Sequence, residues 1–126
     1  MFLAIASKRH ILTAQGNLAN TYKALGRHEE ANRMKRDVYS GFLKLKGKEY
    51  EETLQAANNY ALSLKSLSRF EEAKSLLRRT VPVARRILGE EDRITLIMRW
   101  IYALALSEHN AATRARGESR IACRAS

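Results

Sequence analysis

The feature that most constrains this chain is an internal repeat with a period of 42 residues. The Glu-Glu-Ala at 29–31 aligns with the same tripeptide at 71–73, and at this offset about thirteen pairs of residues are identical. Most of the remaining pairs keep their apolar or polar character. The repeat predicts one structural unit that occurs twice, at residues 11–52 and 53–94.

Each unit is predicted to be a hairpin of two amphipathic α-helices. In the second copy, apolar residues recur in steps of three and four, so they share one face of a helix rather than alternating as in a strand. The first stripe consists of Leu54, Ala57, Tyr60, Ala61, Leu64 and Leu67. The second consists of Phe70, Ala73, Leu76, Leu77, Thr80, Val81, Ala84 and Ile87. The fold class is therefore all-α, with first-copy helices near 11–25 and 28–45.

Three residues are expected to shape the second hairpin. Ser68 precedes Glu71 by three positions, which predicts a capping box at the start of the second helix. Pro82 lies inside that helix, and because the apolar stripe continues beyond it we expect a kink near 77–79 rather than an end. Gly89 stands where a helix commonly ends in the left-handed conformation. Small residues at Ala61 and Ala73 flank the turn and allow close approach of the two helices.

A third copy begins at Thr95 and supplies one helix through Leu106 or Ser107. Its predicted core stripe is Leu96, Tyr102, Ala103 and Leu106, which leaves Ile97, Trp100, Ile101 and Leu104 outside the core. An uncovered apolar face of this kind marks a docking surface, either for a following hairpin or for a peptide. We expect residues 1–10 to extend the first helix, 11–110 to form the repeat domain with a partial repeat at 95–110, and 111–126 to be a basic tail, frayed or disordered.

The composition limits the classes of function and partner that this chain can have. The net charge is +10 with 23 Lys and Arg residues, which permits acidic peptides, nucleic acid or an anionic surface as partners. Cys123 is the only cysteine, so no intrachain disulfide and no cysteine-based zinc site can form. No apolar stretch approaches membrane-spanning length, and we expect a cytoplasmic protein with no membrane partner. The three histidines are isolated and no catalytic or phosphate-binding motif occurs, so we expect no enzyme activity, no cofactor and no metal.

Three segments carry a resemblance to a known family. Residues 58–61 (Asn-Asn-Tyr-Ala), 69–73 (Arg-Phe-Glu-Glu-Ala) and 86–89 (Arg-Ile-Leu-Gly) resemble the tetratricopeptide repeat (TPR) of kinesin light chains. The resemblance implies that about two and a half hairpins stack into a right-handed α-solenoid whose first helices line a concave face. It also implies that Asn17 and Asn59 contact bound peptide, because both match the second asparagine of the family signature.

Residues of the first helices that lie off the core stripe are the predicted lining of a peptide-binding groove. They are Asn17, Asn20, Lys23, Gln55, Asn58, Asn59, Leu62, Lys65 and Trp100. Carboxamides suit the backbone of an extended peptide, and lysines suit acidic side chains or a terminal carboxylate. The sequence therefore predicts a non-catalytic protein–protein interaction module that binds extended, acidic peptide segments.

Two alternatives remain open. The chain could be a structural fragment of a longer repeat array that stacks on further repeats and binds no ligand of its own. Separately, the uncovered third-repeat face predicts self-association of the isolated chain. Nucleic-acid binding through the basic ridge of Arg78, Arg79, Arg85 and Arg86 is less favoured. No aromatic residues interleave with those arginines, and arginines near a helix C-terminus complement the helix dipole.

Overall fold

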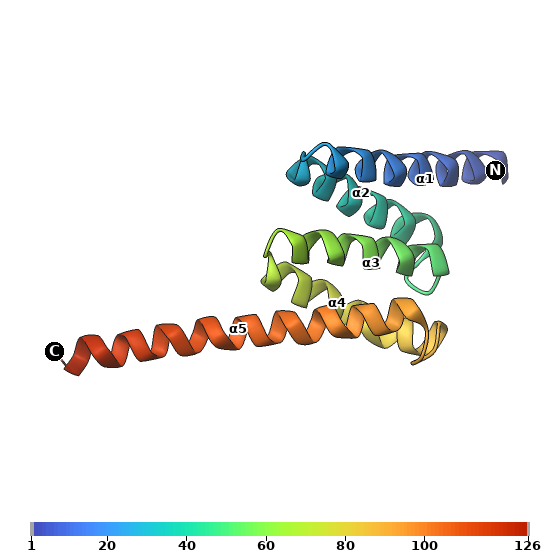
Figure 1. The fold of residues 1–126 in the computed structure, drawn as a ribbon. Coiled ribbons are helices and arrows are strands. Elements are labelled where there is room, and N and C mark those ends of the chain that lie inside the picture. Colours follow the sequence, from blue (N-terminus) through green and yellow to red (C-terminus); the bar gives the residue numbers. More distant parts are fainter. Residues whose placement is uncertain (1, 126) are drawn as a thin grey trace.

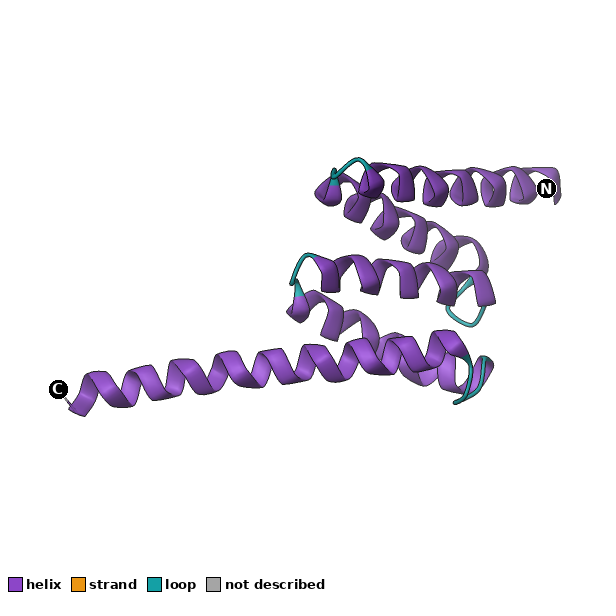
Figure 2. Cartoon of the chain, in the orientation of Figure 1, coloured by secondary structure: helices purple, strands orange, loops and turns teal. Residues whose placement is uncertain are grey.

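The computed structural model describes the backbone of residues 2–125 and the side chains of residues 7–108 and 111. Over residues 2–125 the chain forms helices joined by short loops, with no strand (Figure 2). The helices are α1 (Phe2–Ala24), α2 (His28–Lys46), α3 (Glu51–Ser66), α4 (Phe70–Ile87) and α5 (Arg93–Ala125). Each helix packs against the next one along the chain, and α3 also packs against α5 (Figure 1). The all-α solenoid expected from the repeat is confirmed.

The outer helix boundaries agree with the expected ones in α1 and α4 and differ in α5. α1 begins at Phe2 and so includes the residues that precede the first repeat. α5 runs without interruption to Ala125, past the end expected near Ser107, and projects beyond the other helices in Figure 1. α4 continues through Pro82 to Ile87, so the proline does not end the helix.

The capping box expected at Ser68 is wrong. The N-cap residue of α4 is Arg69, and no side chain caps this end. Ser68 instead takes a positive φ of 57° and ends α3. Its amide donates to the Lys65 carbonyl (3.0 Å), and the Arg69 amide donates to the Leu64 carbonyl (2.9 Å). This pair of bonds is a Schellman motif, which satisfies the carbonyls of Leu64 and Lys65 at the end of α3.

The first hairpin turns in the same way, with glycine at the equivalent position. Gly26 has a φ of 82°. Its amide donates to the Lys23 carbonyl (3.0 Å), and the Arg27 amide donates to the Tyr22 carbonyl (2.9 Å). Both turns therefore require a left-handed residue, and only the first copy has the residue type that adopts this conformation without strain. Gly89, expected to be left-handed, has a φ of 96°.

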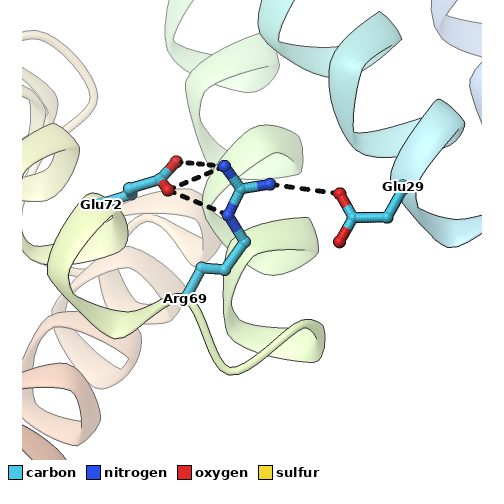
Figure 3. Close-up of polar contacts among 3 residues, drawn as sticks. All are labelled: Glu29, Arg69 and Glu72. Atoms are coloured by element: carbon cyan, nitrogen blue, oxygen red, sulfur yellow. Dashed lines mark hydrogen bonds and ion pairs between the residues drawn. The ribbon is translucent and has the colours of Figure 1, made fainter.

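An arginine at the second turn links the two hairpins (Figure 3). Arg69 donates to Glu72 of α4 at 2.7–2.9 Å and to Glu29 of α2 at 3.3 Å. The equivalent Arg27 pairs with Glu30 within the first hairpin. Because these side chains are largely exposed, the ion pairs contribute little to stability.

The main core lies between α3, α4 and α5. Its buried members are Leu54, Ala57, Ala61, Leu64, Ala73, Leu76, Leu77, Val81, Val83, Ala84, Met98 and Ile101. Ala61 and Ala73 are fully buried, as their small size at the hairpin contact predicts. A second, smaller cluster joins α2 to α3 through Val38, Phe42 and Ala56, with Leu12 of α1 packed against it. Among the residues whose side chains are described, the first hairpin thus contributes less apolar contact than the second.

The core stripe expected for the third copy is wrong at Leu96 and Ala103, whereas Tyr102 does pack against the main core. Leu96 is 50% exposed and Ala103 is also exposed, whereas Met98 and Ile101 are completely buried. At the repeat offset, the predicted stripe of α5 aligns with the face of α3 that packs against α4. No helix among the described residues covers that face of α5. What is buried instead is the face toward the preceding hairpin, where the Thr95 hydroxyl also donates to the Ala84 carbonyl at 3.3 Å.

Candidate functional site

A polar pocket lies between α1 and α3. It has a volume of about 260 Å³ and is lined by Leu12, Thr13, Gly16, Asn17, Asn20, Val38, Phe42, Glu52, Gln55, Ala56 and Asn59. Val38 and Phe42 of α2 contribute apolar side chains to the lining, and α1 and α3 contribute carboxamides. Four of the predicted groove residues are therefore brought together: Asn17, Asn20, Gln55 and Asn59.

Helix periodicity explains why these carboxamides converge. Asn17 and Asn20 are three residues apart on α1, and Gln55 and Asn59 are four apart on α3, so each pair occupies one face of its helix. All four are exposed. Each carboxamide offers two donors and an acceptor, which matches the alternating amides and carbonyls of an extended peptide.

The pocket has a paired charge at one side. Arg9 of α1 donates through Nε to both carboxylate oxygens of Glu52, at 2.9 and 3.1 Å, and its Nη2 forms an ion pair with the same group. The hydrogen bond to Glu52 raises the pKa of Arg9. Arg9 therefore offsets the charge of Glu52, the acidic side chain among the pocket-lining residues.

A buried lysine lies next to the pocket. Lys35 of α2 is only 8% exposed, and it lines a small recess of about 20 Å³ together with Gly16, Asn20, Val38, Ala56 and Asn59. Burial lowers the pKa of Lys35, and the nearby charge of Lys23 lowers it further. Among the described residues no carboxylate forms an ion pair with Lys35.

Lys65 and Trp100 form a second feature on the α3–α5 side. The Lys65 ammonium lies 4.3 Å from the centroid of the Trp100 ring, which is a cation–π contact. Trp100 remains 54% exposed. The two predicted groove residues are thus in contact, and they offer a cation and an aromatic surface at one place.

The other three predicted groove residues lie in different surroundings. Lys23 is exposed and close enough to Lys35 to affect its pKa. Leu62 is half-buried and packs against the main core. Asn58 is only 7% exposed, and its Oδ1 has no hydrogen-bond partner among the described residues. Asn58 therefore offers the open pocket little surface.

The sequence interpretation missed Lys35 and Gly16. A signal for Lys35 existed, because it falls in the apolar stripe of α2 and aligns with Leu77, which is fully buried. Gly16 aligns with the buried Asn58. A Cβ added at Gly16 would meet no atom within 4 Å, so this position is open where the second copy carries a side chain.

The basic ridge on α4 is partly neutralised. Arg85 pairs with Glu90 at 2.9 Å, and Arg86 pairs with Glu49. These contacts favour the interpretation of the ridge as a solvated helix face. In the part of the chain whose side chains are described, no three His, Cys, Asp or Glu residues gather in a way that could hold a metal ion.

Repeated helix hairpins that pack in series define this chain as an α-helical repeat protein. A family model for the tetratricopeptide repeat matches residues 11–40 and 53–93, more than half of the chain. The chain therefore belongs to the tetratricopeptide repeat family. A comparison with curated proteins gave no match. Family membership supports protein–protein interaction as the general function. Among residues 2–125, no helix combines the length and apolar character needed to cross a bilayer.

Proposed function

We propose that this chain is a non-catalytic module that binds an extended, acidic peptide segment in the pocket between α1 and α3. The observation that carries the proposal is the convergence of Asn17, Asn20, Gln55 and Asn59 around one cavity of about 260 Å³. Such a cavity is large enough for one or two residues of a bound peptide, with the rest of the segment along the helices.

The charge distribution supports an acidic ligand. Lys35 lines a recess together with Asn20 and Asn59, Lys23 is near enough to lower the pKa of Lys35, and Glu52 is balanced by Arg9. The whole chain has a net charge of +10, which accelerates the approach of an acidic partner. The resemblance of residues 58–61, 69–73 and 86–89 to kinesin light chain repeats supports a peptide as the ligand but names no motor protein.

The test is fluorescence anisotropy with a library of short, fluorescein-labelled acidic peptides. The pocket variant Asn17→Ala/Asn59→Ala should weaken binding, and Lys23→Glu should weaken it more than Arg78→Glu does. Arg78 is exposed on α4, away from the pocket, and makes the same change of charge. Binding should also weaken with salt, because charge attraction is screened over about 8 Å at physiological ionic strength.

If Lys23→Glu and Arg78→Glu lower the peptide affinity equally, the binding is due to non-specific charge attraction and not to the pocket. An absence of binding across the library would reject the proposal and leave the second candidate.

The second candidate is a structural segment of a longer repeat array, favoured by the apolar face of α5. Leu96 and Trp100 are 50% and 54% exposed on a surface that a further helix would bury in such an array. This candidate predicts self-association of the isolated chain, measured by sedimentation, and its loss in Leu96→Glu. A cytoplasmic location stays a prediction.

A further inference from the structure

A second cavity lies between the two hairpins and shares no lining residue with the polar pocket between α1 and α3. Its volume is about 170 Å³, and its lining comes from α2, the α2–α3 loop, α3 and α4. Apolar walls are supplied by Leu43 of α2, Leu54 of α3 and Val83 of α4, together with the ring of Tyr39. The function proposed above uses none of these residues.

A threonine that lines this cavity lacks the hydrogen-bond partner of its counterpart in the next repeat. Thr53 is 1% exposed, and its Oγ1 has no partner among the described residues. Thr95, at the aligned position, donates to the Ala84 carbonyl of the preceding helix. A buried hydroxyl without a partner is unfavourable. A polar ligand atom that pairs with Thr53 would therefore be stabilised at the buried end of the cavity.

Two cations stand at the solvent side of the cavity. Lys48 and Arg79 are exposed, whereas the other lining residues are buried or half-buried. Among the described residues, neither cation forms an ion pair with a carboxylate, and no Asp or Glu lines the cavity. Burial raises the pKa of Tyr39 and the charge of Arg79 opposes this effect, so the guanidinium lies near the Tyr39 hydroxyl. Lys48 aligns with Glu90, so the second copy reverses this charge.

Size and chemistry together select a ligand for this cavity. An apolar cavity of roughly 150 Å³ holds one benzene-sized molecule, and a guanidinium pairs well with a planar carboxylate. We propose that the cavity binds a small hydroxylated aromatic carboxylate. The ring lies between Leu54 and Val83, the carboxylate lies at Arg79 and Lys48, and the ring hydroxyl pairs with Thr53. The site is separate from the proposed peptide pocket and does not depend on it.

Nuclear magnetic resonance titrations of the full chain test the ligand class with three probes. The backbone amide signals of Thr53 and Val83 should shift with 4-hydroxybenzoate, with a Kd of about 1 mM or tighter. 4-Hydroxybenzyl alcohol keeps the ring and loses the charge, whereas acetate keeps the charge and loses the ring. Each should bind at least about tenfold more weakly, because each lacks one part of the recognition.

Three outcomes would overturn the proposal. Equal binding of acetate would mean a general attraction of anions to the surface, and equal binding of the alcohol would mean an apolar cavity without an anion site. An absence of shifts with 4-hydroxybenzoate at about 10 mM would mean that the cavity takes no such ligand.

Arg79→Gln tests the carboxylate contact, and Arg78→Gln is its matched control. Both arginines are exposed on α4, but only Arg79 lines the cavity. Arg79→Gln should weaken 4-hydroxybenzoate by about tenfold through loss of a charged hydrogen bond. Arg78→Gln should weaken it by less than about twofold, as is usual for a screened surface charge. Equal losses from the two variants would show that the proposal is wrong.

Thr53→Val tests the buried end of the site. Valine is similar in shape and removes a hydroxyl that has no partner, so the variant should fold with a Tm no lower than that of the wild type. It should weaken 4-hydroxybenzoate by about fivefold and leave benzoate, which has no ring hydroxyl, unaffected. The assignment of Thr53 is wrong if both ligands, or neither, lose affinity.

Discussion

Ser68 is the position at which a single substitution should stabilise this protein. It adopts a φ of 57° at the end of α3, where the first hairpin has Gly26 with a φ of 82°. The left-handed conformation costs a residue with a Cβ about 1–2 kcal/mol, because the Cβ approaches the carbonyl oxygen. Glycine avoids this cost, but it loses about 0.5–1 kcal/mol more conformational entropy on folding. The net gain in the free energy of unfolding for Ser68→Gly is therefore about 0.7 kcal/mol, the middle of a range of roughly 0–1.5 kcal/mol.

Thermal and urea denaturation followed by circular dichroism would measure the gain. A stabilisation of this size should raise the Tm by about 2–4 °C in a chain of this length. Gly26→Ser is the matched reverse change and should lower the free energy of unfolding by a similar amount. Gly26 has no atom near a built Cβ, so backbone strain is the only cost expected there.

Ser68→Ala separates this explanation from a capping box. A serine that caps α4 would lose about 1 kcal/mol on truncation to alanine. The hydrogen bonds of the structure place no cap at Ser68, so Ser68→Ala should be nearly neutral. A destabilising Ser68→Ala together with a neutral or destabilising Ser68→Gly would refute the reasoning.

Four further outcomes are expected. Ala61→Leu should lower the free energy of unfolding by about 1–3 kcal/mol through overpacking, and a neutral thermal melt would contradict the hairpin contact. Arg69→Met should cost at most about 1 kcal/mol, and the cost should shrink in high salt because the ion pairs to Glu29 and Glu72 are exposed. Lys35→Leu should stabilise the fold at neutral pH. Burial lowers the pKa of Lys35 from 10.5, so the charged lysine opposes folding below its folded-state pKa. This penalty fades as the pH rises toward 10.5. Denaturation at several pH values should therefore show the stabilisation by Lys35→Leu shrinking as the pH rises. Native-state hydrogen exchange should open α1 before α3, because α1 packs against the smaller apolar cluster.

The groove residues show which parts of the candidate site helix periodicity can predict. Asn17, Asn20, Gln55 and Asn59 were assigned to one surface from helix periodicity, and they line one pocket. Asn58, assigned to the same surface, is buried instead. Periodicity gives the direction of a side chain around its own helix. It does not state which neighbouring helix occupies that direction, so adjacent positions such as Asn58 and Asn59 could not be told apart.

Local sequence determined the hairpins themselves, because the spacing of apolar residues and the repeat length depend only on residues close in the chain. Tertiary packing decided the rest. Ile101 is buried and Leu96 is exposed because α5 meets the preceding hairpin on one face and no described helix on the other. Lys35 is largely buried because α2 packs against both α1 and α3, and residues of all three helices line the recess beside it. Burial depends on which helices meet, and that is a property of the assembled stack rather than of any one helix.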